Sequence, residues 1–184
     1  MKTLTLLLTL ALYLASPPVL ATGDYFEYFY RDFDIGNADV AAEFQQVLRA
    51  VDQKNYSDAS QLMSALVGKL DAAPNLDPGA HAQLLADAGI LKASVFDNKA
   101  ALDLLDKSDK MVVRYVGVYS PMLFNMLMAQ GMVHSNVKDY PAAIESFRRA
   151  QHIVHRQDGV FSPKQIGVID KIARVDQEQG SWLD

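Results

Sequence analysis

Two five-residue stretches of this chain are nearly identical and lie 42 residues apart: GVYSP at 117–121 and GVFSP at 159–163. In each stretch the glycine suits the left-handed residue that follows a helix. The serine suits the cap of the next helix, and the proline suits its first turn. Each stretch is therefore interpreted as a joint where one helix ends and another begins. Two such joints at a fixed spacing indicate a repeated structural unit.

The same 42-residue offset aligns residues of similar size over most of the chain. A column of alanines contains Ala59, Ala101 and Ala143, and a column of large apolar residues contains Met63, Leu105 and Phe147. A column of small or slim residues contains Val47, Gly89, Gly131 and Ala173. A turn column contains Tyr56, Asn98, Tyr140 and Trp182, and the residues before its first three members, Asn55, Asp97 and Asp139, suit helix caps. The chain is therefore interpreted as a repeat protein.

Apolar residues recur at helical spacing in each unit, so every unit is expected to be a pair of helices. The expected pairs cover 40–53 with 57–72, 78–96 with 99–115, and 121–137 with 141–157, followed by one unpaired helix over 163–179. We expect at least seven helices and no sheet. The predicted fold class is all-α, an α-solenoid of antiparallel helix pairs with about 3.5 repeats.

The third unit resembles a tetratricopeptide repeat. The residues that carry the resemblance, in the order and spacing of that family, are Gly131, Tyr140, Ala143, Phe147 and Ala150. The first unit matches with Tyr56, Ala59 and Met63, and the second with Gly89, Ala101 and Leu105. Asn98 and Ser108 depart from the pattern. The resemblance covers residues 40–184, with a period of 42 rather than the commonest 34. Because that longer period overlaps other helical repeats, a generic α-solenoid stays as the alternative.

The resemblance implies a scaffold or adaptor that is not an enzyme. Such a stack holds a peptide or protein partner in a concave groove lined by the first helices of the pairs. The residues expected to face this groove are Phe44, Leu48, Ile90, Asn125, Met128, Met132, Ser135, Asn136 and Arg174. No catalytic residue, metal or cofactor is expected. The partner is expected to be a protein or peptide.

Histidine offers the main alternative, a metal-binding or enzymatic protein. His152 and His155 lie one helical turn apart and could share a metal. No carboxylate nearby on that helix completes a ligand set, and the two histidines also fit a basic stripe with Arg148, Arg149 and Arg156. The chain contains no cysteine, which excludes disulfides, thiol catalysis and thiolate metal sites. A further alternative is that the chain is the N-terminal part of a longer repeat array.

Residues 1–21 are predicted to be a signal peptide. A positive start at Lys2 is followed by an apolar run over 4–14 and by small residues up to Ala21, after which cleavage is expected. A membrane anchor is the alternative, but the run is shorter than the ~20 residues that a spanning helix needs. Cleavage would leave 16 basic against 22 acidic side chains, which disfavours binding to nucleic acid or to an anionic membrane. No other stretch is apolar enough to span a membrane, so no membrane insertion is expected after cleavage. The mature protein is therefore expected to be secreted or periplasmic.

The segment 22–38, which precedes the repeat domain 39–184, is rich in aromatic and acidic residues. Phe26, Phe29, Tyr30 and Phe33 fit one face of a helix. One interpretation is a short helix that covers the open end of the first repeat, because a stack needs sealed ends. The other is an aromatic patch that binds a partner.

The last expected helix has no second helix to pair with. Ile169, Ile172 or Val175 would then be partly uncovered, whereas burying such a side chain contributes ~1.5–3 kcal/mol. Trp182 occupies the turn position that precedes a second helix in the other units. We therefore expect more protein to complete this edge, in the same chain or through self-association at the C-terminal edge.

Overall fold

The computed structural model describes residues 24–180. The predicted signal peptide and Trp182 lie outside the described residues. Within 24–180 the chain forms one short 3-10 helix and seven α-helices, with no strand. The helices are η1 (Asp24–Glu27), α2 (Ala38–Asp52), α3 (Tyr56–Leu70), α4 (Pro78–Ser94), α5 (Asn98–Tyr115), α6 (Met122–Asn136), α7 (Tyr140–Asp158) and α8 (Pro163–Gln179).

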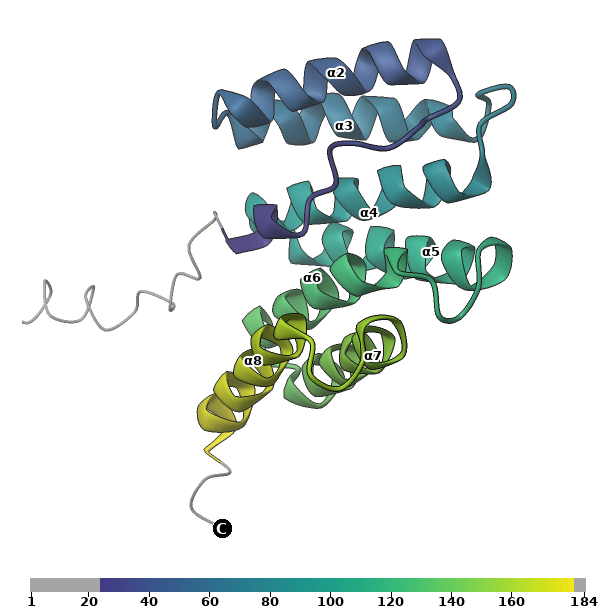
Figure 1. Cartoon of the computed structure of the whole chain (residues 1–184). Helices are drawn as coiled ribbons and strands as arrows, with labels where there is room; N and C mark the ends of the chain where they lie inside the picture. The colour runs from purple at the N-terminus through teal and green to yellow at the C-terminus, as the bar shows by residue number, and fades with distance from the viewer. Residues whose placement is uncertain (1–23, 181–184) are drawn as a thin grey trace, which may run out of the picture.

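The helices stack as consecutive pairs, each of which packs mainly on its neighbours in sequence (Figure 1). α2 pairs with α3, α4 with α5, and α6 with α7, while α8 follows α7 as a single helix. The prediction of an all-α solenoid with at least seven helices is therefore confirmed for the described part of the chain. No helix there is long and apolar enough to cross a membrane.

Side-chain caps explain where most of these helices begin. The side chains of Asn37, Asn55, Asp77, Asp97, Asp139 and Ser162 each accept a hydrogen bond from a backbone N–H in the first turn of the helix that follows. Such caps satisfy N–H groups that have no partner inside the helix. The three caps of the second helices are the Asn55, Asp97 and Asp139 column that the sequence predicts.

The backbone itself repeats every 42 residues at the end of each first helix. Lys54, Phe96, Lys138 and Gly180 all have a positive φ, between 58° and 78°. A left-handed residue is a common way to end a helix, and only one of these four is the glycine that favours it. The turn geometry is thus a property of the repeat, and it is kept even where the residue is not glycine.

Close contact in the second and third pairs depends on a glycine of the first helix. A Cβ atom placed on Gly131 would lie 2.5 Å from the ring of Phe147, and one placed on Gly89 would lie 2.7 Å from Leu105. The glycines therefore leave room for the large apolar side chain of the second helix. Ala143, on the second helix of the third pair, is completely buried.

Candidate protein-interaction site on the first-helix face

Residues 24–37 run across the face of the stack that is formed by the first helices of the pairs. We call this surface, formed by α2, α4, α6 and α8, the first-helix face. The segment begins at η1 beside α4 and continues as an irregular chain to the start of α2 (Figure 1). The face expected to hold a partner therefore already holds a peptide segment of the same chain.

Aromatic side chains attach this segment to the first pair. The rings of Phe29 and Phe33 both pack on Phe44 of α2, with ring centroids 6.2 Å and 5.6 Å away. The ring of Phe26 stacks on Tyr56, the first residue of α3, at 4.3 Å. Aromatic pairs in these geometries contribute ~0.5–1.5 kcal/mol beyond the area that they bury. These contacts give the segment an apolar anchor on α2 and α3.

A buried carboxyl group on α4 holds the backbone of the segment. Oδ1 of Asp87 accepts a hydrogen bond from the backbone N–H of Tyr30 at 2.9 Å and another from Nε2 of Gln83 at 3.4 Å. Asp87 is completely buried, and its Oδ2 has no hydrogen-bond partner among the described residues. Burial raises the pKa of Asp87 well above its ordinary value, although both hydrogen bonds oppose the shift. A protonated carboxyl is the form that such a site favours.

A third anchor lies at the other end of the segment, on α6. The side-chain amide of Asn136 donates a hydrogen bond to the hydroxyl of Tyr25, a residue 111 positions earlier in the chain. Tyr25 is almost completely buried. The segment thus contacts three successive first helices, α2, α4 and α6.

The structure corrects one expectation for this segment. The aromatic residues do not form a helix face, because only Asp24–Glu27 is helical and the rest is irregular. A helix advances 1.5 Å per residue, whereas extended chain advances up to ~3.3–3.6 Å. An irregular chain can therefore reach from α6 to α2, and it covers the first-helix face rather than only the open end of the first repeat.

An open cleft of about 680 Å³ remains beside the segment. It lies among the N-terminal ends of α4, α6 and α8, with Tyr30 and Phe33 of the segment on one side. Apolar groups of its lining come from Phe33, Tyr115, Val116 and Met122, and polar groups come from Asp34, Asp77, Gln83, Asn125 and Lys164. Of the residues predicted for the groove, Asn125 is the one that lines this cleft.

The other predicted groove residues lie in different environments. Phe44 and Asn136 are on the first-helix face and contact the segment. Ser135 contacts Glu178 of α8. Leu48 is half-buried, and Arg174 is exposed and pairs with Asp170. Ile90, Met128 and Met132 are buried in the core, because neighbouring helices pack on both sides of α4 and α6. Those three cannot contact a partner in this arrangement, so their assignment as groove-lining residues is wrong for this structure.

Sequence reasoning missed the polar centre of the site, Asp87 with Gln83. Asp87 is the only charged residue in the apolar run LLADAGIL at 84–91. A single acid inside such a run is a signal that could have identified it, because buried charges are rare unless they have partners.

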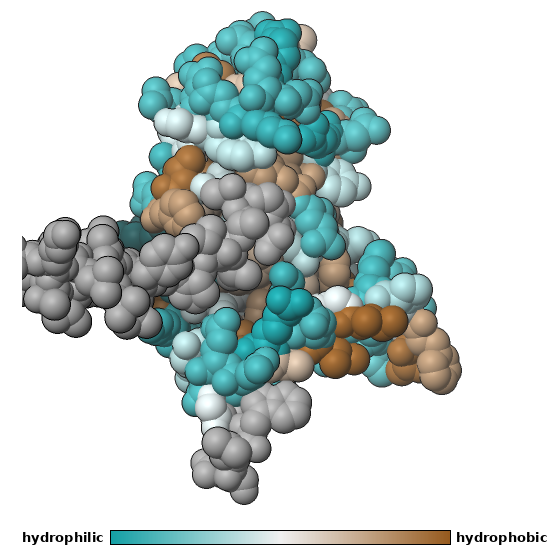
Figure 2. Space-filling model, turned by 90° about the vertical axis from the view of Figure 1, so that its left-hand side faces the viewer, coloured by the Kyte–Doolittle hydropathy of each residue, from teal (hydrophilic) through white to brown (hydrophobic). Residues whose placement is uncertain are grey.

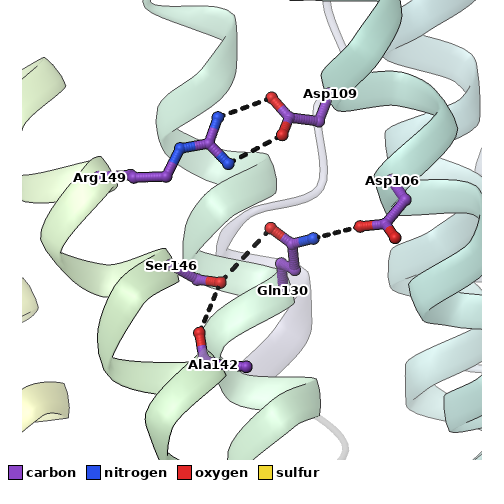
Figure 3. Close-up of polar contacts among 6 residues, drawn as sticks. All are labelled: Asp106, Asp109, Gln130, Ala142, Ser146 and Arg149. Atoms are coloured by element: carbon purple, nitrogen blue, oxygen red, sulfur yellow. Dashed lines mark hydrogen bonds and ion pairs between the residues drawn. The ribbon is translucent and has the colours of Figure 1, made fainter.

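The basic stripe on α7 is partly used to hold the stack together. The guanidinium of Arg149 forms two parallel hydrogen bonds with Asp109 of α5, at 2.8 Å and 2.9 Å (Figure 3). Beside this pair, Gln130 of α6 donates to Asp106 of α5 at 2.6 Å, and its carbonyl accepts from Ser146 of α7 (Figure 3). The network therefore joins the second pair to the third.

Neither histidine of the alternative hypothesis belongs to a cluster of possible metal ligands. Within residues 24–180, no group of three or more His, Asp or Glu side chains is arranged to hold a metal ion. The ring of His152 packs against Tyr119 at 5.8 Å, and the guanidinium of Arg156 lies 4.1 Å from the centre of the same ring.

Comparison with solved structures supports the helical-repeat fold. The chain is similar to BtubC (BKLC) from P. vanneervenii, with a TM-score of 0.66 and 13% sequence identity. The match covers 76% of this chain and 57% of BtubC, so the chain spans little more than half of that protein. No protein-family model matches the sequence, and no curated protein is detectably similar to it. At this level of identity the likeness concerns the fold alone.

Proposed function

We propose that this chain is a non-catalytic interaction module that binds a peptide segment of a protein partner on the first-helix face. One observation carries the proposal: this face holds residues 24–37 of the chain itself. It does so through a backbone hydrogen bond to Asp87 and through aromatic contacts with Phe44. A surface that binds one irregular peptide by these means has the chemistry to bind another. The finer assignment to the tetratricopeptide-repeat family is part of the same proposal.

The partner peptide is expected to enter the open cleft beside the segment. The cleft combines apolar surface from Met122 and Tyr115 with the charged groups of Asp77 and Lys164. Its volume of about 680 Å³ lies in the range of ~300–1,000 Å³ that is typical of sites for small ligands. Binding here leaves the segment in place and uses it as one wall of the site.

A photo-crosslinking experiment tests this location in the organism that makes the protein. A photoreactive amino acid is introduced at Asn125, which lines the cleft, and in a matched variant at Arg148, which is exposed on the outer side of α7. We expect a discrete crosslinked partner from position 125 and none from position 148. The same adduct from both positions, or an adduct from position 148 alone, would move the site to the outer face.

A blocking variant tests whether the partner binds in the cleft. Asn125→Trp should fill part of the cleft and remove capture of the partner found by crosslinking, while the circular dichroism spectrum stays helical. Arg148→Trp makes the same change outside the cleft and should leave capture intact. Undiminished capture by Asn125→Trp would contradict the proposal.

We also propose that the protein is exported, and that the signal peptide is removed after Ala21. The basic and apolar pattern of residues 1–21 supports this proposal. N-terminal sequencing of exported protein should begin at Thr22. Retention of Met1 in exported material would contradict it.

A further inference from the structure

We infer that α8 presents a docking face for an amphipathic helix of another protein, which would pair with α8 as the second helices pair with α4 and α6. The face consists of Ile166, Ile169 and Ala173. It is separate from the cleft, and the inference does not depend on the proposed function.

The repeat defines this face residue by residue. On α4, Ala82 and Gly89 lie against α5: the hydroxyl of Ser108 donates to the carbonyl of Ala82 at 2.7 Å, and Gly89 faces Leu105. Residues 82, 85 and 89 share one helix face. The 42-residue offset moves these positions to Phe124, Leu127 and Gly131 on α6, and to Ile166, Ile169 and Ala173 on α8.

Burial differs sharply among these equivalent positions. Leu85 and Leu127 are completely buried, whereas Ile169 is 53% exposed and Ile166 is 71% exposed. The opposite side of α8 is the one that packs on the stack, through Val168 and Val175. Phe161, just before α8, is 96% exposed. Figure 2 shows apolar surface in the lower part of the molecule, at the height where Figure 1 places α8.

The occupant follows from continuity with the three helix pairs already formed. Each second helix buries a small residue, a large apolar residue four positions later, a small or aliphatic residue three positions after that, and an aliphatic residue four positions further on. The sets are Ala59, Met63, Leu66 and Leu70; Ala101, Leu105, Ser108 and Val112; and Ala143, Phe147, Ala150 and Val154. The partner is therefore expected to carry a helix of about four turns with this pattern, antiparallel to α8.

The chain supplies a suitable probe for this face. A fluorescently labelled peptide with the sequence of residues 55–72 contains the cap Asn55 and the whole of α3. Its partner in the stack, α2, carries Val47 at the position where α8 carries Ala173. Because alanine is smaller than valine, Met63 of the peptide has room on α8. We expect saturable binding of this peptide to the full chain by fluorescence anisotropy.

Substitutions distinguish binding of the peptide at α8 from replacement of α3 by the peptide in the first pair. Ile169→Lys should weaken binding at least tenfold without loss of helicity, because Ile169 is already half-exposed. Lysine is used because the offset places Ile169 where α2 carries Glu43, which pairs with Lys69 of α3, and an acid at position 169 would recreate that ion pair with the peptide. Val113→Lys makes the same change at an exposed position of α5 and should have no effect. A peptide with Met63→Glu should bind at least tenfold more weakly.

Two results would overturn the inference. One is absence of binding, or binding that Ile169→Lys leaves unchanged. The other is a dimer in analytical ultracentrifugation that Ile169→Lys dissociates, since the face would then belong to a second copy of the chain.

Discussion

The backbone N–H of Tyr30 donates a hydrogen bond to Oδ1 of Asp87, across 57 residues of sequence, at 2.9 Å. The contact uses no side-chain atom of Tyr30, and the residue is 46% exposed. Asp87 therefore recognises a peptide backbone, with specificity left to the aromatic residues on either side.

The pH dependence of stability should reveal the buried carboxyl group. Because burial raises the pKa of Asp87, the folded chain binds this proton more tightly than the unfolded chain does. The stabilisation is fully present below the ordinary pKa of 3.8 and is lost as pH rises through the raised value. Asp87→Asn cannot ionise, so its Tm should exceed that of the wild type at pH 8, and the difference should shrink toward pH 4. A gain of 1 kcal/mol corresponds to about 2–4 °C in Tm.

The control for this comparison is Asp103→Asn, an exposed carboxylate on α5 that pairs with Lys99. Its Tm should follow the wild type over the same pH range. Equal pH profiles for wild type and Asp87→Asn would show that Asp87 is not held as a neutral acid.

Phe44→Ala should release the N-terminal segment as well as destabilise the stack. Phe44 is buried, and the rings of Phe29 and Phe33 both pack against it. Phenylalanine-to-alanine changes at buried positions cost ~3–5 kcal/mol. Chymotrypsin should therefore cleave within residues 25–33 faster than in the wild type, at a temperature where the helices persist. Phe161→Ala is the control, because its side chain is almost fully exposed and its loss should alter neither Tm nor this cleavage.

A pair of glycine-to-alanine changes should have opposite signs. The added Cβ of Gly131→Ala would lie 2.5–2.8 Å from three ring atoms of the buried Phe147, and such overpacking costs ~1–3 kcal/mol. Gly167→Ala on α8 meets no atom within 4 Å and should stabilise the helix by ~0.4–1 kcal/mol. Urea denaturation of the two variants measures both effects. A Gly131→Ala variant as stable as Gly167→Ala would contradict the close contact between α6 and α7.

The ion pair between α5 and α7 should show measurable coupling. Arg149 and Asp109 form two hydrogen bonds, and Asp109 is mostly buried. The hydrogen bond to Asp109 also raises the pKa of Arg149. A double-mutant cycle with Arg149→Met and Asp109→Asn should give a coupling free energy in the range of ~0.5–3 kcal/mol. The same cycle for the exposed pair of Lys99 and Asp103 should give a smaller coupling, because solvent screens that pair.

The helices were predictable because the 42-residue repeat shows the same helix pattern in several units, so each unit supports the assignment of the others. The expected bounds of the seven α-helices differ from the observed ones by no more than two residues at either end. Gly131 and Phe147 could be paired from their columns alone, since a small or slim residue and a large one recur together in the first three units. Helix caps such as Asp97 gave independent support for the same bounds.

The path of the N-terminal segment could not be predicted, because no repeat constrains it. The spacing of Phe26, Phe29, Tyr30 and Phe33 fits a helix, but contacts with residues far away in sequence determine its conformation. Residues such as Met132 were assigned to the groove because they lie on a first helix. Their position on that helix could not show that α7 and α8 would bury them. The function of Asp87 likewise depends on a residue that lies 57 positions away.

The N-terminal segment also changes how the molecule should unfold. In a linear stack each pair contacts only its neighbours, so repeats can fray one after another from the ends. Tyr25, bonded to α6, and Phe33, packed on α2, belong to one short stretch of chain that connects non-adjacent units. Opening the first pair therefore loosens the second and third as well. The three pairs should melt as one cooperative unit, with α8 free to exchange its amide hydrogens earlier than the rest.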